Sequence, residues 1–308
     1  TLLDARKIAG GVSDTGQQES VFQPQFGPDG YLYFVSDRSN WWNIYRSNLT
    51  GLQPTIETIT SLDAEFATPQ WVFGMSCYDF LDSNTILCCY TQDGRWGLAS
   101  IDLGSNQGNQ ISQATSHSDT GFDLNKLATD DDNISMICAA HGRGLYFGAS
   151  NIESSCLRQY RPGQPIKTIR QSSSQALALE CLSAPQAITF ASGSEEAHGF
   201  YYAPQNTDYH ASTEELPPLI VLCHGGPTGA TDTALNLKIQ FWCSRGFAVF
   251  DINYRGSTGY GRHYRDSLKE QWGVKDVEDV CAGAQHLVKL GLADPDRLAI
   301  KGGSAGGY

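Results

Sequence analysis

Residues 294–308 read DPDRLAIKGGSAGGY and contain the pattern Gly-x-Ser-x-Gly centred on Ser304. The pattern directly follows a short apolar run, 298–300, that is typical of a buried strand. A nucleophile elbow requires this order, because its turn between strand and helix is so tight that the residues around the nucleophile must be very small. The near neighbours of Ser304 are all Gly or Ala. We therefore predict that Ser304 is a catalytic nucleophile at a helix N-terminus; a plain glycine turn is the alternative.

Two further apolar runs precede this stretch, at 219–223 and 247–252. Such unbroken runs suit parallel strands that are covered on both faces. Before the last strand, apolar residues within 277–288 follow a helical period, and Gly291 is placed to end that helix. The alternation of strands and helices predicts a doubly wound α/β sheet. Residues 184–204 are predicted to form an antiparallel hairpin that leads into it.

A second motif, HGGPT at 224–228, ends the first of these strands. In a sheet of this kind, the loop after an early strand supplies one backbone N–H of an oxyanion hole, and the residue after the nucleophile supplies the other. We therefore predict that the N–H groups of Gly226 and Ala305 form the oxyanion hole. His224 resembles a catalytic base, but it precedes the nucleophile, whereas the chain order in this arrangement is Ser, Asp, His. A structural role is the favoured interpretation of His224.

A third motif, NYRGSTGYG at 253–261, is a glycine-rich loop after a strand, so nucleotide binding has to be considered. Its spacing matches neither the dinucleotide-binding Gly-x-Gly-x-x-Gly pattern nor a phosphate-binding loop with Lys and Ser or Thr at a helix start. A rigid loop that shapes the rim of the pocket is the favoured interpretation.

The first half of the chain, 1–184, has a different pattern of short aromatic and β-branched runs separated by tight turns such as Pro28-Asp29-Gly30. The runs at 31–35 and 86–90 begin similar units, and a weaker copy runs from 124 to 160. The period is about 40–45 residues, which is the length of a four-stranded propeller blade. We predict a partial β-propeller of about four blades, with these aromatic side chains in the blade cores.

Composition and charge narrow the class of protein. The net charge of −12 over 308 residues makes nucleic acid an unlikely partner, since phosphate backbones repel an acidic chain. The chain shows no apolar run of the roughly 18 residues needed to span a membrane, so no membrane association is expected. The nine cysteines include no CxxC pair, which favours reduced thiols, a cytoplasmic location and no zinc site.

Four segments carry a resemblance to a known family: HGGPTG at 224–229, NYRGSTGYG at 253–261, QWGVKDVEDV at 271–280 and DPDRLAIKGGSAGGY at 294–308. They resemble the prolyl oligopeptidase family of serine peptidases, in particular its acylaminoacyl-peptidase and dipeptidyl-aminopeptidase-like members. The resemblance implies a β-propeller at 1–184 that restricts entry to short peptides. At 185–308 it implies the N-terminal half of an α/β-hydrolase domain, ending at the nucleophile elbow.

The same resemblance implies a Ser-His-Asp triad and a transient acyl-enzyme, with no metal or organic cofactor. The triad Asp and His are absent from this chain, because the family places both after the nucleophile and the sequence ends at Tyr308. We therefore expect a fragment, truncated at both ends, that is inactive by itself. An esterase or acyl hydrolase on the same scaffold stays open, as does a non-catalytic propeller interaction protein. Residue preference and oligomeric state do not follow from the sequence.

Overall fold

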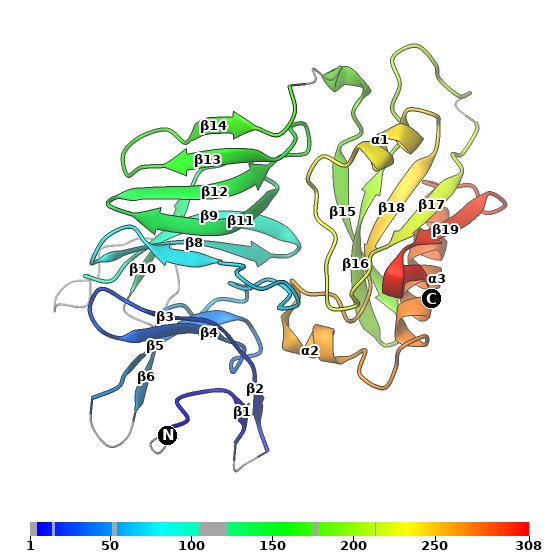
Figure 1. The fold of residues 1–308 in the computed structure, drawn as a ribbon. Helices are drawn as coiled ribbons and strands as arrows, with labels where there is room; N and C mark the ends of the chain where they lie inside the picture. Colours follow the sequence, from blue (N-terminus) through cyan, green and yellow to red (C-terminus); the bar gives the residue numbers. More distant parts are fainter. Residues whose placement is uncertain are drawn as a thin grey trace.

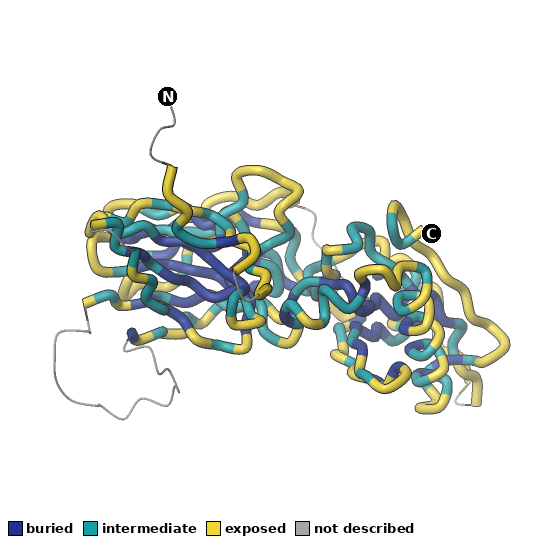
Figure 2. Tube along the Cα trace, turned by 90° about the horizontal axis from the view of Figure 1, so that it is seen from below, coloured by how far each residue is buried: buried dark blue, intermediate teal, exposed yellow. Residues whose placement is uncertain are grey.

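The computed structural model describes residues 5–13, 16–50, 54–104, 122–174, 178–212 and 214–307. They form two parts that lie side by side: a set of antiparallel sheets, and a mixed sheet with helices (Figure 1). Each part has its own buried interior, visible as separate groups of dark-blue residues in Figure 2. That 1–184 and 185–308 are two separate domains stays a prediction.

Three four-stranded antiparallel sheets follow one another in the described residues of the first part. They contain β3 (Val21–Phe26), β4 (Leu32–Ser36), β5 (Asn43–Asn48) and β6 (Thr55–Thr58); β7 (Tyr78–Phe80), β8 (Thr85–Gln92), β9 (Arg95–Asp102) and β10 (Asp123–Leu127); and β11 (Asn133–Ala140), β12 (Arg143–Ala149), β13 (Cys156–Tyr160) and β14 (Lys167–Gln171). Within each sheet, every strand pairs with the next strand along the chain. This meander is the layout of a propeller blade.

The number of sheets is lower than the sequence predicted. We predicted about four blades, and the described residues contain three four-stranded sheets. The difference arises at the two ends of this part. Before β3 the described residues form only a two-stranded ladder of β1 (Gly11–Val12) and β2 (Gln18–Glu19). After β14 the described residues form only the short 3₁₀ helix η1 (Leu179–Cys181) before the next sheet begins.

Strand β8 shows why the sheets stack. Ile86 and Cys88 belong to a buried cluster shared with the first sheet, whereas Leu87 and Cys89 belong to one shared with the third. Successive side chains of a strand point to opposite faces. A strand whose residues are all apolar can therefore pack against a neighbouring sheet on each of its two faces. The predicted role of the aromatic residues in the blade cores is confirmed at Tyr33, Tyr90 and Tyr146, which are all buried, but it is wrong for Phe147, of which 45% is exposed.

The second part is built on a five-stranded mixed sheet in the order β15-β16-β18-β17-β19. Its strands are β15 (Pro185–Ser192), β16 (Glu195–Tyr202), β17 (Leu219–Cys223), β18 (Ala248–Asn253) and β19 (Leu298–Gly302). The predicted leading hairpin is confirmed as β15 and β16, which pair antiparallel. The predicted apolar strands are β17, β18 and β19, which run parallel to one another. The predicted burial is wrong for β19, whose residues are all exposed, because β19 is the last strand at one edge of the sheet in the described residues.

Helices cover both faces of this sheet. They are α1 (Leu237–Cys243) and α3 (Lys275–Lys289); a third, short helix, α2 (Gly261–Asp266), follows the glycine-rich loop. Along β18, Phe250 lies in the cluster that includes Leu287 of α3, whereas Val249 lies in the cluster that includes Ile239 of α1. Helix α3 ends as predicted: Gly291 has φ +71° and donates its N–H to the carbonyl of Val288.

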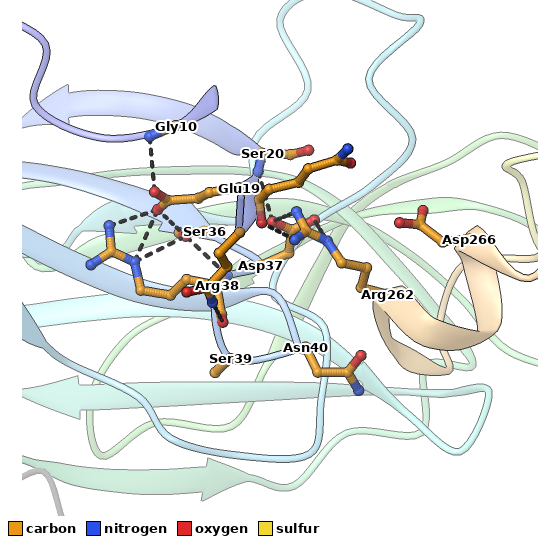
Figure 3. A network of polar contacts seen from close by, with 12 residues as sticks. Gly10, Glu19, Ser20, Ser36, Asp37, Arg38, Ser39, Asn40, Arg262 and Asp266 are labelled. Atoms are coloured by element: carbon orange, nitrogen blue, oxygen red, sulfur yellow. Dashed lines mark hydrogen bonds and ion pairs between the residues drawn. The ribbon is translucent and has the colours of Figure 1, made fainter. Parts of the chain in front are cut away.

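The two parts meet at α2. Arg262 and Arg265 both form ion pairs with the carboxylate of Asp37, which lies in the turn after β4 and has a fully buried side chain. Figure 3 shows Arg262 reaching Asp37, which also accepts the backbone N–H of Ser20 at 2.8 Å. The charges are therefore paired and hydrogen-bonded, as buried ions must be.

A second contact joins the parts at Glu65, between β6 and β7. Its buried carboxylate accepts the backbone N–H groups of Gly259 and Gly261, each at 2.9 Å. Desolvation raises the pKa of Glu65, although these N–H groups act in the opposite direction. The glycine-rich loop of the third motif is thus fixed against the propeller-like part.

Candidate active site

Ser304 lies in a turn directly after β19, where it starts the 3₁₀ helix η2 (Ser304–Gly307). Its φ is +55°, a left-handed conformation that is strained for a residue with a side chain. A sharp, strained turn from strand to helix is the defining feature of a nucleophile elbow. The helix predicted after Ser304 is seen in the described residues as this single short turn.

Two of the small residues around Ser304, Gly302 and Gly306, are required by contact distances. A Cβ atom added to Gly302 would lie 1.7 Å from the carbonyl oxygen of Gly306. A Cβ atom added to Gly306 would lie 2.3 Å from the carbonyl oxygen of Cys223 and 2.5 Å from that of His224. Side chains at either position are therefore excluded by backbone atoms, which cannot move aside as a flexible side chain can.

The second motif lies beside this turn. Strands β17 and β19 pair in parallel with Cys223 opposite Gly302, so the residues that follow each strand emerge at the same edge of the sheet. A Cβ atom added to Gly225 would lie 3.2 Å from Cβ of Ser304. The sequence-predicted residues Gly226 and Ala305 thus belong to two adjacent loops. Their role as oxyanion-hole donors stays a prediction.

His224 is held by two hydrogen bonds, neither of them to Ser304. Nδ1 lies 2.8 Å from the carbonyl oxygen of Gly225, and Nε2 lies 2.8 Å from Oγ of Ser257. The ring also stacks on Tyr254 with centroids 4.5 Å apart. Burial lowers the pKa of His224, although the hydrogen bond to the Gly225 carbonyl acts in the opposite direction. This environment agrees with a structural role, as the chain order suggested.

The third motif forms a loop that is anchored by one of its own residues, Arg255. Its guanidinium is almost fully buried and pairs with Glu195, Glu278 and Asp279 at 2.6 Å each. The hydroxyl of Tyr254 in the same loop donates to the carbonyl oxygen of His224 at 2.9 Å. The loop therefore supports the HGGPT segment. That it shapes the rim of a pocket stays a prediction.

Sequence reasoning did not identify Trp71 as a neighbour of the site. Its indole N–H donates to the carbonyl oxygen of Thr228 at 3.3 Å, and its Cζ2 atom lies 3.1 Å from where a Cβ of Gly226 would stand. A signal was present, since Trp71-Val72-Phe73 is a run of large apolar residues immediately before Gly74. Trp71 lies outside the four-stranded sheets, between β6 and β7, and 57% of it is exposed.

Two kinds of feature are not found in the described ranges. Among these residues, no group of three or more His, Cys, Asp or Glu is arranged to hold a metal ion. None of the described helices is long and apolar enough to cross a membrane; α3, with 15 residues, is the longest of them.

Comparison with known proteins relates the chain to serine peptidases. Residues 233–308 match the model of the prolyl oligopeptidase family. The acylamino-acid-releasing enzyme 1 of Oryza sativa subsp. japonica is 26% identical over 313 residues, which cover 96% of this chain and 40% of the relative. The dipeptidyl aminopeptidase BIII of Pseudoxanthomonas mexicana is 38% identical over 91 residues, or 30% of this chain and 13% of the relative.

A solved structure extends the likeness to nearly the whole chain. The puromycin-hydrolyzing peptidase of Mycobacterium tuberculosis superposes with a TM-score of 0.83 at 33% identity, over 94% of this chain and 43% of that one. The chain thus spans about two fifths of the length of these full-length relatives. The first part matches propeller-like sheets, and the second matches the start of the family's hydrolase domain. The chain belongs to the prolyl oligopeptidase family and is similar to its acylaminoacyl-peptidase and dipeptidyl-aminopeptidase-like members.

Proposed function

We propose that this chain supplies the nucleophile and the oxyanion hole of a serine-type peptidase that cleaves short peptides. The observation that carries the proposal is the strained Ser304, at φ +55°, next to the glycines of the HGGPT loop. We further propose that the catalytic Asp and His come from residues that follow Ser304 in the full-length enzyme. We call the protein that contains both this chain and those residues the full-length enzyme.

The chemistry follows from the positions of these groups. Oγ of Ser304 attacks the carbonyl carbon of the scissile amide, and the catalytic His accepts the proton. The negative charge that develops on the carbonyl oxygen is stabilised by the N–H groups of Gly226 and Ala305. The C–N bond then breaks as the His returns the proton to the leaving amine. Water hydrolyses the resulting acyl-enzyme and regenerates Ser304.

Short peptides are the favoured substrates for two reasons. Relatives of the chain are named for releasing acylamino acids and for dipeptidyl aminopeptidase activity. In addition, the segment between β6 and β7 contacts the loops of the site at Glu65 and Trp71, and we infer that the propeller-like part restricts the approach of large substrates. An esterase remains the second candidate, because an elbow of this kind attacks esters and amides alike.

The compartment is also a proposal. All nine cysteines are free thiols, and five of them are buried. Thiols persist in reducing compartments, so we propose a cytoplasmic location.

The test compares the full-length enzyme with its Ser304→Ala variant. We expect a fluorophosphonate probe to label only the unsubstituted enzyme, and short peptide amides to be hydrolysed by it alone. Hydrolysis of simple esters without any hydrolysis of peptides would favour the esterase. Equal labelling of both proteins would show that Ser304 is not the nucleophile.

A further inference from the structure

The turn that contains Trp71, Val72 and Phe73 exposes three consecutive large apolar residues. Their exposed fractions are 57%, 61% and 99%. A run of this kind on a surface is unfavourable unless it serves a function, because apolar side chains gain free energy when they leave water. We call these three residues the apolar turn.

The apolar turn is attached to the candidate active site. Trp71 donates a hydrogen bond to Thr228 and lies beside Gly226, and a Cβ atom added to Gly225, the preceding residue, would lie 3.2 Å from Cβ of Ser304. The sequence of contacts from Ser304 to Trp71 therefore passes through only two consecutive glycines. Trp71 stands next to the loop that would hold the oxyanion, and not at a remote surface.

The apolar turn is also held in place from its N-terminal side. Six residues before Trp71, the buried carboxylate of Glu65 accepts N–H groups from Gly259 and Gly261. The segment is thus fixed to the second part of the molecule at Glu65 and again at Trp71. A binding surface that is fixed before the ligand arrives loses less conformational entropy on binding.

We propose that the apolar turn is a subsite for a bulky apolar or aromatic side chain of the substrate, next to the bond that Ser304 attacks; this inference rests on the proposed function. Aromatic and aliphatic walls are the usual lining of such subsites, and aromatic pairs add attraction beyond the area they bury. The full-length enzyme therefore prefers peptides with Phe- or Leu-like side chains over those with Gly at this position.

The test uses two phosphonate probes for serine hydrolases that differ only in one side chain, benzyl in one and hydrogen in the other. We measure the second-order rate of Ser304 labelling in the full-length enzyme. We expect the benzyl probe to react faster. We expect Phe73→Ser and Val72→Ser to slow the benzyl probe by about tenfold, the order of magnitude for a lost buried side-chain contact, with the other probe within about twofold.

A matched control is Phe26→Ser. Phe26 is also an exposed phenylalanine, at 65%. Phe26 is the last residue of β3 and pairs with Leu32, the first residue of β4. The opposite end of β4 leads to Asp37, which contacts α2. Phe26 is therefore at the far end of that sheet, and we expect this variant to leave both rates unchanged.

The outcomes separate the two proposals. If the apolar-turn variants slow both probes equally, or slow neither, the subsite is wrong while the nucleophile stands. The same holds if Phe26→Ser reproduces their effect. If neither probe labels Ser304 in the unsubstituted enzyme, the proposed function itself fails, and the subsite fails with it.

Discussion

Gly302 and Gly306 approach each other so closely across the turn at Ser304 that a Cβ atom on Gly302 would lie 1.7 Å from the carbonyl oxygen of Gly306. We therefore expect Gly302→Ala to force a shift of the backbone and to displace Ser304. The free energy of unfolding should fall by about 1–3 kcal/mol, as for other overpacked sites. Labelling of Ser304 by a fluorophosphonate in the full-length enzyme should be lost.

The control for this prediction is the next residue. A Cβ atom on Gly303 would meet no heavy atom within 4 Å. Gly303→Ala should therefore retain both the stability and the labelling. If the two alanine variants behave alike, close packing at Gly302 is not what shapes the elbow.

The contact between Asp37 and Arg262 predicts a large stability effect at the junction of the two parts. The Asp37 side chain is fully buried and pairs with both Arg262 and Arg265. Asp37→Asn removes the negative charge and leaves the arginines without their partner. We expect the free energy of unfolding in urea to fall by about 3–5 kcal/mol, the usual cost of breaking a buried pair.

Glu215→Gln provides the matched comparison, since it also changes a carboxylate to an amide in an ion pair with an arginine. Its partner is Arg297, at 3.2 Å, and both side chains are about half exposed. Surface pairs of this kind contribute about 0–1 kcal/mol. A loss at Asp37 as small as that at Glu215 would mean that the junction does not depend on this charge.

Much of the fold could be predicted because its signals are local. The run at 219–223 is strand β17, with the same bounds, and the helical period at 277–288 lies within α3. The tight turn at Ser304 could be predicted for the same reason, since the small residues that it needs are consecutive in the sequence. The predicted number of blades was less accurate, because the repeat period alone does not tell which repeats form all four strands of a blade.

The contacts between distant segments could not be predicted. Nothing near Asp37 in the sequence indicates that its partners lie more than 220 residues away, at Arg262 and Arg265. The same is true of Trp71, whose partner Thr228 is 157 residues away. A large apolar residue between strands is ordinarily expected in the core. The position of Trp71 beside the candidate site could therefore be recognised only in the three-dimensional structure.

The hydrogen bond between His224 and Ser257 predicts a positioning role for Ser257. Loss of its hydroxyl in Ser257→Ala removes the partner of Nε2 and loosens the ring whose Nδ1 is bound to Gly225. Small displacements of catalytic loops are costly, so we expect Ser304 labelling in the full-length enzyme to slow by about ten- to a hundredfold. The shape of its pH dependence should not change, because His224 is not the base.

Ser267→Ala is the control for this variant. Like Ser257, Ser267 donates its hydroxyl to the carbonyl oxygen of a tyrosine three residues earlier, Tyr264 in this case. It lies at the end of α2, where it has no contact with His224 to lose, and labelling should be unaffected. A changed pH profile in Ser257→Ala would contradict the structural role of His224.

The buried carboxylate of Asp251 predicts that stability depends on pH. Desolvation raises its pKa from 3.8 to about 7, although the hydroxyl of Thr231 acts in the opposite direction. Between these values the folded chain binds more protons than the unfolded chain, so the free energy of unfolding falls as the pH rises from about 4 to 7. At 1.36 kcal/mol per pKa unit, the contribution lost is roughly 4 kcal/mol at most.

Asp251→Asn isolates this contribution, since an amide has no proton to release in that range. The pKa values of Asp232 and Glu65 are also raised by burial, so the unsubstituted protein should lose stability from several groups at once. We therefore expect urea unfolding between pH 4 and 8 to give a difference curve that grows in favour of the variant as the pH rises. A flat difference curve, or one of opposite slope, would mean that Asp251 is ionised in the folded chain throughout this range and that its environment does not oppose the charge.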